Sequence, residues 1–195
     1  MTKFIRVALV LAACLLALAG CKEEKAAQDI APKDMNAQTL GHYCQMNLLE
    51  HPGPKAQVHL EGMPAPLFFS QVRDAIAYVR APEQIAPILA IYVNDMGAPG
   101  ATWDKPGDGN WLAADRAFFV VGSVREGGMG APETVPFASA EKAEAFARAE
   151  GGHIVKLSAI TDDMVLTPVE TGPRPDPDDK DYLDRLDTLS HSHGG

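Results

Sequence analysis

A repeated order of motifs constrains the fold of this chain more than any other feature of its sequence. The segment Gly62–Pro66 (GMPAP) leads into a short apolar run and then a helical pattern, and Gly128–Pro132 (GMGAP) leads into the same succession. Runs rich in β-branched and aromatic residues, which favour strands, stand before and after each helical pattern. The sequence therefore predicts an α+β fold with two similar β-β-α-β units related by internal duplication.

The helices of the two units are predicted from apolar spacing and capping residues. In the first, apolar residues recur at i, i+3, i+4 and i+7 after a potential N-cap at Ser70, and Pro82 ends the pattern. In the second, Ser139 is the potential N-cap, and a pair of glycines at 151 and 152 ends the helix. The apolar positions are Val72, Ala75, Ile76 and Val79 in the first helix and Ala143, Phe146 and Ala147 in the second. The predicted strands are 57–60, 67–69 and 88–93 in the first unit and 117–124, 134–137 and 153–160 in the second.

Composition divides the chain into a leader, a tether, two structured units and a tail. The tether is polar and has no sustained apolar period, and the tail is rich in Pro and Asp and ends near a His-Ser-His sequence. A linker rich in Gly, Pro and Asp at 94–110 separates the units. The predicted boundaries are 1–20 for the signal peptide, 21–38 for the flexible tether, 39–100 for the first unit, 101–169 for the second unit and 170–195 for the disordered acidic, histidine-bearing tail.

The N-terminus predicts export and lipid attachment. Lys3 and Arg6 precede an apolar run from Val7 to Leu18, which is too short to span a bilayer comfortably. The run ends in Leu-Ala-Gly-Cys, which resembles the bacterial lipoprotein box, so Cys21 would carry the lipid and become the new N-terminus. We therefore expect a lipid anchor on the periplasmic side of a bacterial membrane, with the outer membrane favoured over the inner one.

The mature chain is acidic and keeps a single unmodified thiol. Loss of Lys3 and Arg6 with the signal peptide leaves 15 basic side chains against 26 acidic ones, a formal net charge of −11, which argues against nucleic-acid binding. Of the three cysteines, Cys14 leaves with the signal peptide and Cys21 carries the lipid, so Cys44 can form no internal disulfide. A lone thiol in an oxidising compartment is expected to be either buried and inert or used for binding.

Three potential metal ligands alternate at His42, Cys44 and Met46. Alternate side chains of an extended chain share one face, so we expect these three to point together if the stretch is extended. A thiolate with a thioether is a soft donor set, which favours Cu(I) over hard cations. Met129 stands in a glycine-rich turn, where its large flexible side chain serves either packing or metal binding.

The segment YCQMNLLEHPGPKAQ together with a later GGMGAPETVPF, on a lipoprotein of this size, resembles the NosL family of nitrous oxide reductase accessory proteins. The resemblance covers essentially the whole mature core. It implies a membrane-anchored periplasmic chaperone that carries Cu(I) as cargo and delivers it for the maturation of nitrous oxide reductase. The implied partners are the periplasmic component of an ABC-type maturation complex and, as a further candidate, the reductase itself.

Residue by residue, the resemblance also implies a ligand set. It assigns the metal site to Cys44, Met46, Met129 and, as first choice for a nitrogen donor, His42, with His51 and His59 as alternatives. The chain departs from the expected family pattern at Gln45, where glycine is common, and at Gly127, where a Gly-Pro-Met run is expected. Neither departure removes a ligand.

Other interpretations remain open. In one, Cys44 is buried and the duplicated units form the docking surface of a structural lipoprotein. In another, the metal is zinc, bound by histidines with Cys44, which leaves the methionines without a role. Catalysis is not expected, because no nucleophile motif surrounds the thiol and a Cys-x-x-Cys pair is missing.

Overall fold

The structure is a computed structural model that describes residues 27–82, 84–107, 109–167 and 183–185. The predicted signal peptide, the predicted lipidation site Cys21 and most of the predicted tail at 170–195 lie outside the described residues. Within the described part of the chain, no helix is long and apolar enough to cross a membrane.

The first unit is built around β1 (Ala56–Leu60), whose five residues are all buried. β2 (Leu67–Phe69) and β3 (Ile88–Asn94) pair antiparallel with its two edges. α2 (Val72–Arg80) connects β2 to β3 and packs on this sheet through the apolar stripe that the sequence predicted. β1 is therefore covered on both edges and both faces.

The second unit repeats this arrangement. β5 (Phe118–Val121) is central, with β6 (Val135–Phe137) and β7 (His153–Lys156) antiparallel on its two edges. α3 (Ala140–Glu150) connects β6 to β7. The strand orders β2-β1-β3 and β6-β5-β7 are equivalent, which confirms the predicted α+β fold with two β-β-α-β units.

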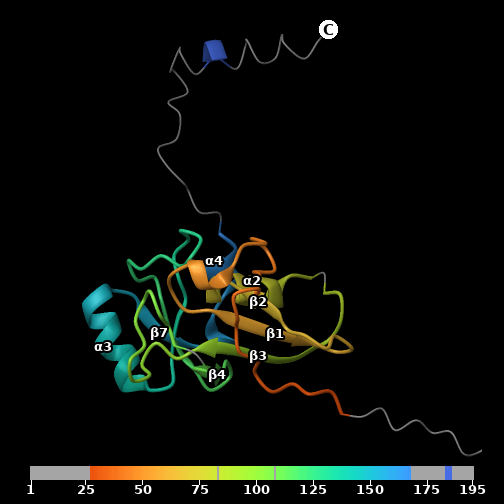
Figure 1. Cartoon of the computed structure of the whole chain (residues 1–195). Coiled ribbons are helices and arrows are strands. Elements are labelled where there is room, and N and C mark those ends of the chain that lie inside the picture. Colours follow the sequence, from red (N-terminus) through yellow and green to blue (C-terminus); the bar gives the residue numbers. More distant parts are fainter. Residues whose placement is uncertain (1–26, 83, 108, 168–182, 186–195) are drawn as a thin grey trace, which may run out of the picture.

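The chain also contains elements that the duplicated pattern did not predict. A short 3-10 helix, η1 (Leu48–Glu50), precedes β1, and β4 (Trp111–Ala113) pairs with β3, so the first sheet has the order β2-β1-β3-β4. The strand predicted at 153–160 ends after β7, and the chain continues as η2 (Leu157–Ala159) and α4 (Asp162–Leu166). Figure 1 shows α2 and α4 on the same side of the first sheet and α3 beside β7.

The boundary predicted between residues 100 and 101 does not separate two independent bodies. β4 comes from the second half of the chain and belongs to the first sheet. Phe119 of β5 faces the large hydrophobic cluster under α2, whereas its neighbour Val120 faces the smaller cluster under α3. Ile160 and Val165 also pack in the large cluster. The two units therefore share the large cluster, because each is too small to bury its own apolar surface.

The two connecting helices begin in different ways. Ser139 caps α3 as predicted, since its side chain accepts a hydrogen bond from the backbone N–H of Lys142 at 3.4 Å. α2 does not use Ser70, because Gln71 occupies the N-cap position and its side chain does not cap the helix. The first amide groups of α2 therefore need another acceptor.

That acceptor comes from the second unit. The carboxyl group of Glu133 accepts hydrogen bonds from the backbone N–H groups of Val72 at 3.3 Å and Arg73 at 3.0 Å. It also accepts from the N–H of Thr134 at 2.8 Å. A side chain distant in the sequence thus provides the cap that the local sequence predicted from Ser70.

Part of the predicted tether is anchored on the first sheet. The Nε2 atom of Gln28 donates to the carbonyl oxygens of Leu60 at 2.7 Å and Met63 at 2.9 Å. Gln57 of β1 exchanges hydrogen bonds of 2.8 and 3.0 Å with the backbone of Lys33. The prediction of a flexible tether over 21–38 is therefore corrected for the segment 28–33, which side-chain hydrogen bonds fix to β1.

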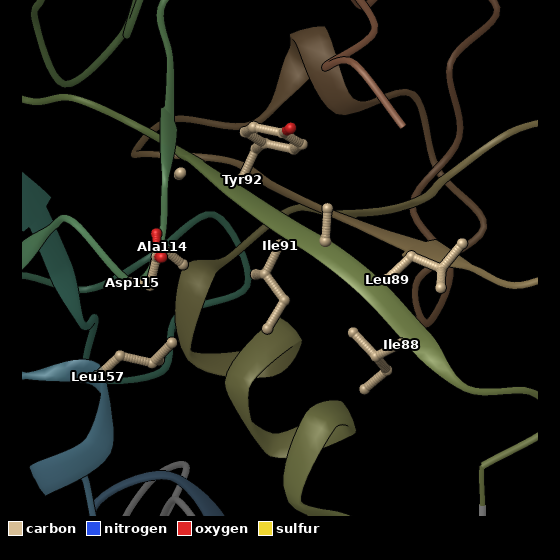
Figure 2. A pocket seen from close by; sticks show the side chains of 9 residues that line it. Ile88, Leu89, Ile91, Tyr92, Ala114, Asp115 and Leu157 are labelled. Carbon is tan, nitrogen blue, oxygen red and sulfur yellow. The ribbon is translucent and has the colours of Figure 1, made fainter. Parts of the chain in front are cut away.

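A hollow of about 300 Å³ lies along β3 (Figure 2). In this view Ile88 and Ile91 point toward α2, and Tyr92 points to the other side of the strand. Leu89, Ala90, Ala113, Ala114, Asp115 and Leu157 complete the lining. None of the nine lining residues carries a sulfur atom or an imidazole ring, so this hollow is not where the predicted ligands gather.

Candidate metal centre

The stretch that carries three of the predicted ligands is a closed loop. Residues 42–44 form a turn, and the backbone N–H of Gly41 donates to the carbonyl oxygen of Met46 at 3.0 Å. Gln45 has a φ of 54°, in the left-handed region. The expectation that alternate side chains share one face of an extended chain is therefore wrong for this stretch.

The left-handed conformation explains why glycine is the expected residue at position 45. Among the residues that the structure describes, Gln45 is the single non-glycine with a positive φ. Its side chain compensates in part, because Nε2 donates to the carbonyl oxygens of His42 at 2.7 Å and Gly41 at 3.3 Å. Gln45, where the chain departs from the family pattern, thus has a strained backbone, and its side chain hydrogen-bonds within its own turn.

His42 packs in an aromatic cluster. Its ring centroid lies 5.3 Å from that of Tyr43, 5.6 Å from Phe69 and 5.4 Å from Tyr78. Its backbone N–H donates to the carbonyl oxygen of Phe68 at 2.6 Å, so the loop is fastened along β2. The imidazole, the first choice for a nitrogen ligand, is therefore held by packing against β2 and α2.

Cys44 and Met46 occupy the inside and the outside of the same loop. Cys44 is a free, partly buried thiol whose Sγ lies 4.0 Å from the carbonyl oxygen of Met46 and packs directly against Gly41. The Met46 side chain is 41% exposed. The structure thus brings one thiol and one accessible thioether side chain into a single turn.

Met129 lies on a turn of the second unit that is seated on the first unit. Its backbone N–H and that of Ala131 donate to Oε1 of Gln71 at 3.0 and 3.3 Å. The carbonyl oxygen of Gly128 lies 3.1 Å from Nδ1 of His51. The Met129 side chain itself is 42% exposed. The third predicted sulfur ligand is therefore presented at the junction of the two units.

The backbone of this turn approaches the first unit so closely that it requires glycine. A Cβ atom on Gly127 would lie 2.5 Å from Oε2 of Glu133 and 2.7 Å from Oε1 of Gln71. A Cβ atom on Gly128 would lie 2.8 Å from Cβ of His51. The glycines beside Met129 thus serve the contact between the units as well as the turn.

Of the three histidines considered as nitrogen donors, His51 lies beside the Met129 turn. A hydrogen bond from Nδ1 to the Gly128 carbonyl leaves the lone pair of Nε2 free for a metal ion. His59 is buried in the first sheet, its Nε2 lies 3.0 Å from Oε1 of Gln57, and burial lowers its pKa. We therefore favour the alternative His51 over His42 and His59.

A buried lysine lies near the Cys44 thiol and the Glu133 carboxyl. Lys55 is 1% exposed, and its Nζ donates to the carbonyl oxygens of Pro52 at 2.9 Å and Gly53 at 2.5 Å. Burial lowers the pKa of Lys55 to about 8, against the opposing influence of Glu133 and Cys44. Lys55 thus places positive charge near the thiol. It also lines a cavity of about 410 Å³ beside the loop, with His51, Met35, Leu48, Leu49, Gly100, Asp104, Lys105, Pro106 and Gly107.

Lys55, Gln71 and Glu133 also belong to this region and were not among the residues predicted from the sequence. Glu133 nevertheless stands in the Met-Gly-x-x-Glu segment that carried the family resemblance, so a signal was present. Its role depends on α2, which lies far away in the sequence. Burial raises the pKa of the Glu133 carboxyl to about 8, although hydrogen bonds from the amides of Arg73 and Thr134 favour the charged form.

The donors at this end of the molecule are rich in sulfur. Cys44 and Met46 share one loop, Met129 contacts the first unit through its turn, and both loops adjoin the 51–55 segment. In the described ranges, no three His, Cys, Asp or Glu side chains lie close enough together to hold one metal ion.

The fold and this surface define a class of protein: a small two-sheet α+β protein with a thiol and a thioether on one loop of the first unit and a further thioether on the turn where the second unit contacts the first. A family model described as NosL matches residues 32–165, and the chain belongs to the NosL family. This finding confirms the resemblance seen in the sequence.

Relatives and a solved structure agree with this assignment. The chain is 70% identical to the copper-binding lipoprotein NosL of Achromobacter cycloclastes, over 95% of this chain and 96% of that protein. It is 34% identical to the copper-binding lipoprotein NosL of Stutzerimonas stutzeri, over 77% of this chain and 78% of that protein. It resembles the crystal structure of the copper chaperone NosL from Shewanella denitrificans with a TM-score of 0.63 and 29% identity, over 70% of this chain and 98% of the other.

Proposed function

We propose that this protein is a Cu(I) chaperone whose cargo is bound by Cys44, Met46 and Met129, with His51 as the nitrogen donor. The observation that carries the proposal is the arrangement of sulfur side chains: a partly buried thiol and an exposed thioether in one closed loop, and a second exposed thioether on a turn fastened to the same unit. The names of the relatives, copper-binding lipoprotein and copper chaperone, support copper as the metal.

The donor set suits a metal that must be released again. Thiolate and thioether ligands are soft and favour Cu(I) over zinc, which takes several thiolates or imidazoles in structural sites. Met46 and Met129 are 41% and 42% exposed, so a ligand from a partner can approach the bound ion. A chaperone must bind Cu(I) and later pass it to a partner, so its site needs both affinity for the ion and access for the partner's ligand. No catalytic step is needed for this function.

The location and the recipient extend the same proposal. A lipid on Cys21 would hold the protein at the periplasmic face of a bacterial membrane, with the outer membrane favoured. The term lipoprotein in the names of the relatives supports lipid attachment. The recipient would be the nitrous oxide reductase maturation machinery, through the periplasmic component of an ABC-type complex, or the reductase itself.

An anaerobic Cu(I) titration of the full chain in detergent, against a chromophoric competitor, tests the copper site. We expect one tightly bound equivalent, which Cys44→Ser abolishes and Met129→Leu weakens. Met96→Leu is the matched control, because Met96 heads another Met-Gly-Ala-Pro segment but packs against the small core under α3. Failure of the unmodified chain to retain Cu(I) would overturn the proposal, and a parallel Zn(II) titration would then test the zinc alternative.

A further inference from the structure

The side chain of Gln71 reaches from the start of α2 into the turn that carries Met129. Its Oε1 accepts two backbone hydrogen bonds from that turn, from the N–H groups of Met129 at 3.0 Å and Ala131 at 3.3 Å. Its Nε2 donates to Oδ2 of Asp74 at 2.9 Å. These contacts fix the orientation of the amide. A flipped amide would place Oε1 against the Asp74 carboxylate and direct its NH₂ group at the two N–H donors of the turn. Gln71 is 2% exposed, so water does not replace these contacts easily.

The turn has few other polar means of holding its place on the first unit. Hydrogen bonds from Gly127 N–H to the Ala131 carbonyl at 2.8 Å and from Gly130 N–H to the Gly127 carbonyl at 2.9 Å close the turn itself. These bonds do not fix the turn relative to the loop of Cys44. Gln71, the contact between His51 and Gly128, and the cap of α2 by Glu133 do so. In the described part of the chain, Gln71 is the side chain that hydrogen-bonds to the Met129 backbone itself.

The geometry points to Gln71 as a positioning residue for the soft-metal site, which fixes Met129 where its sulfur can share an ion with Cys44. Gln71 does not touch the metal ion; it acts through the backbone of the turn. This inference rests on the proposed function, because it assumes that Met129 is a ligand.

The expected size of the effect follows from the way metal sites depend on outer contacts. A ligand that is already in place when the ion arrives loses less conformational freedom on binding. Removal of a residue that orients a ligand typically weakens metal binding roughly 10- to 100-fold. Gln71→Leu keeps the approximate volume of the side chain and removes the acceptor, so we expect a loss of Cu(I) affinity in this range.

Gln84 provides a matched control at the other end of the same helix. Its Nε2 donates to the carbonyl oxygens of Tyr78 and Val79, both at 2.9 Å, and to that of Ala81 at 3.3 Å. Within the described residues, none of these partners belongs to the Met129 turn. Gln84→Leu therefore also removes a side-chain amide contact with α2, here a partly buried one at the C-terminal end of the helix. We expect its Cu(I) affinity to equal that of the unmodified chain when both are titrated in detergent under anaerobic conditions.

A double-mutant cycle separates positioning from general stabilisation. If Gln71 acts through Met129, the substitution Gln71→Leu has no further effect on Cu(I) affinity in a Met129→Leu background. Equal losses in both backgrounds would overturn the inference, as would equal losses in Gln71→Leu and Gln84→Leu. Absence of Cu(I) binding by the unmodified chain is a different result, since it refutes the copper site itself.

A second variant tests the same contact from the side of the turn and leaves Gln71 in place. Gly127→Ala directs a methyl group at Oε1 of Gln71 and Oε2 of Glu133, so it should displace the clamp and weaken Cu(I) binding. Amide hydrogen exchange gives the structural readout: Met129 and Ala131 should be protected in the unmodified chain and exchange faster in Gly127→Ala. Faster exchange with unchanged Cu(I) affinity would show that the position of the turn is irrelevant and would overturn the inference.

Discussion

The substitution Glu133→Gln should change the way in which folding stability depends on pH. Glu133 is 2% exposed, and its carboxyl group accepts hydrogen bonds from the amides of Val72, Arg73 and Thr134. Burial raises its pKa from 4.5 to about 8 in the folded protein. Between pH 4.5 and about pH 8, Glu133 therefore keeps its proton in the folded protein, whereas it has lost this proton in the unfolded chain.

The sign and the size of the effect follow from this difference. Because the folded-state pKa is raised, the stabilisation is fully present below pH 4.5 and is lost as the pH rises toward 8. One step of pKa corresponds to about 1.36 kcal/mol, so the loss across this window is at most about 5 kcal/mol. Glutamine has no proton to lose in this window, but its NH₂ group would face one amide donor, at a cost of about 1–3 kcal/mol at every pH.

Urea unfolding of the unmodified protein and of Glu133→Gln, from about pH 5 to about pH 8, measures the difference in the free energy of unfolding. The unmodified protein should be the more stable of the two near pH 5, and its advantage should shrink or reverse near pH 8. The other ionisable groups are common to both proteins, so their contributions largely cancel in the difference. A difference that stays constant across this range would refute the reasoning, because the carboxyl would then carry the same charge in the folded and unfolded states.

Substitutions at three further positions test the loops and a helix cap. Gln45→Gly should be more stable than Gln45→Ala by about 1 kcal/mol in urea unfolding. Both variants lose the side-chain hydrogen bonds, but only glycine adopts the positive φ without strain. Equal stabilities would show that the backbone at position 45 is not strained. Gly128→Ala should destabilise the fold by about 1–3 kcal/mol and weaken Cu(I) binding, since its Cβ would lie 2.8 Å from Cβ of His51; an unchanged thermal midpoint would show that the turn can move aside freely. Ser139→Ala should lower the free energy of unfolding by about 1 kcal/mol in thermal unfolding, because the N–H of Lys142 loses its hydrogen bond to the Ser139 side chain. An unchanged stability would show that water satisfies this N–H group equally well.

The sequence determined the features that depend on neighbours along the chain. The repeated motif and the apolar spacing were sufficient to predict two β-β-α-β units, because side-chain periodicity alone separates helix from strand. Ser139 was recognisable as a cap because it hydrogen-bonds only three residues away. The sulfur-containing residues and the lone thiol were recognisable from their chemistry, since softness as a ligand belongs to the side chain and not to the fold.

Tertiary structure decided how those side chains are arranged. The closed loop at 41–46, which overturned the predicted shared face, depends on one residue with a positive φ and on a backbone bond back to Gly41. The cap of α2 comes from Glu133 and the clamp on Met129 from Gln71, and each of these contacts spans about sixty positions in the sequence. Local patterns carry no information about which distant segments meet, because that choice is made when residues of both units pack into the large hydrophobic cluster under α2.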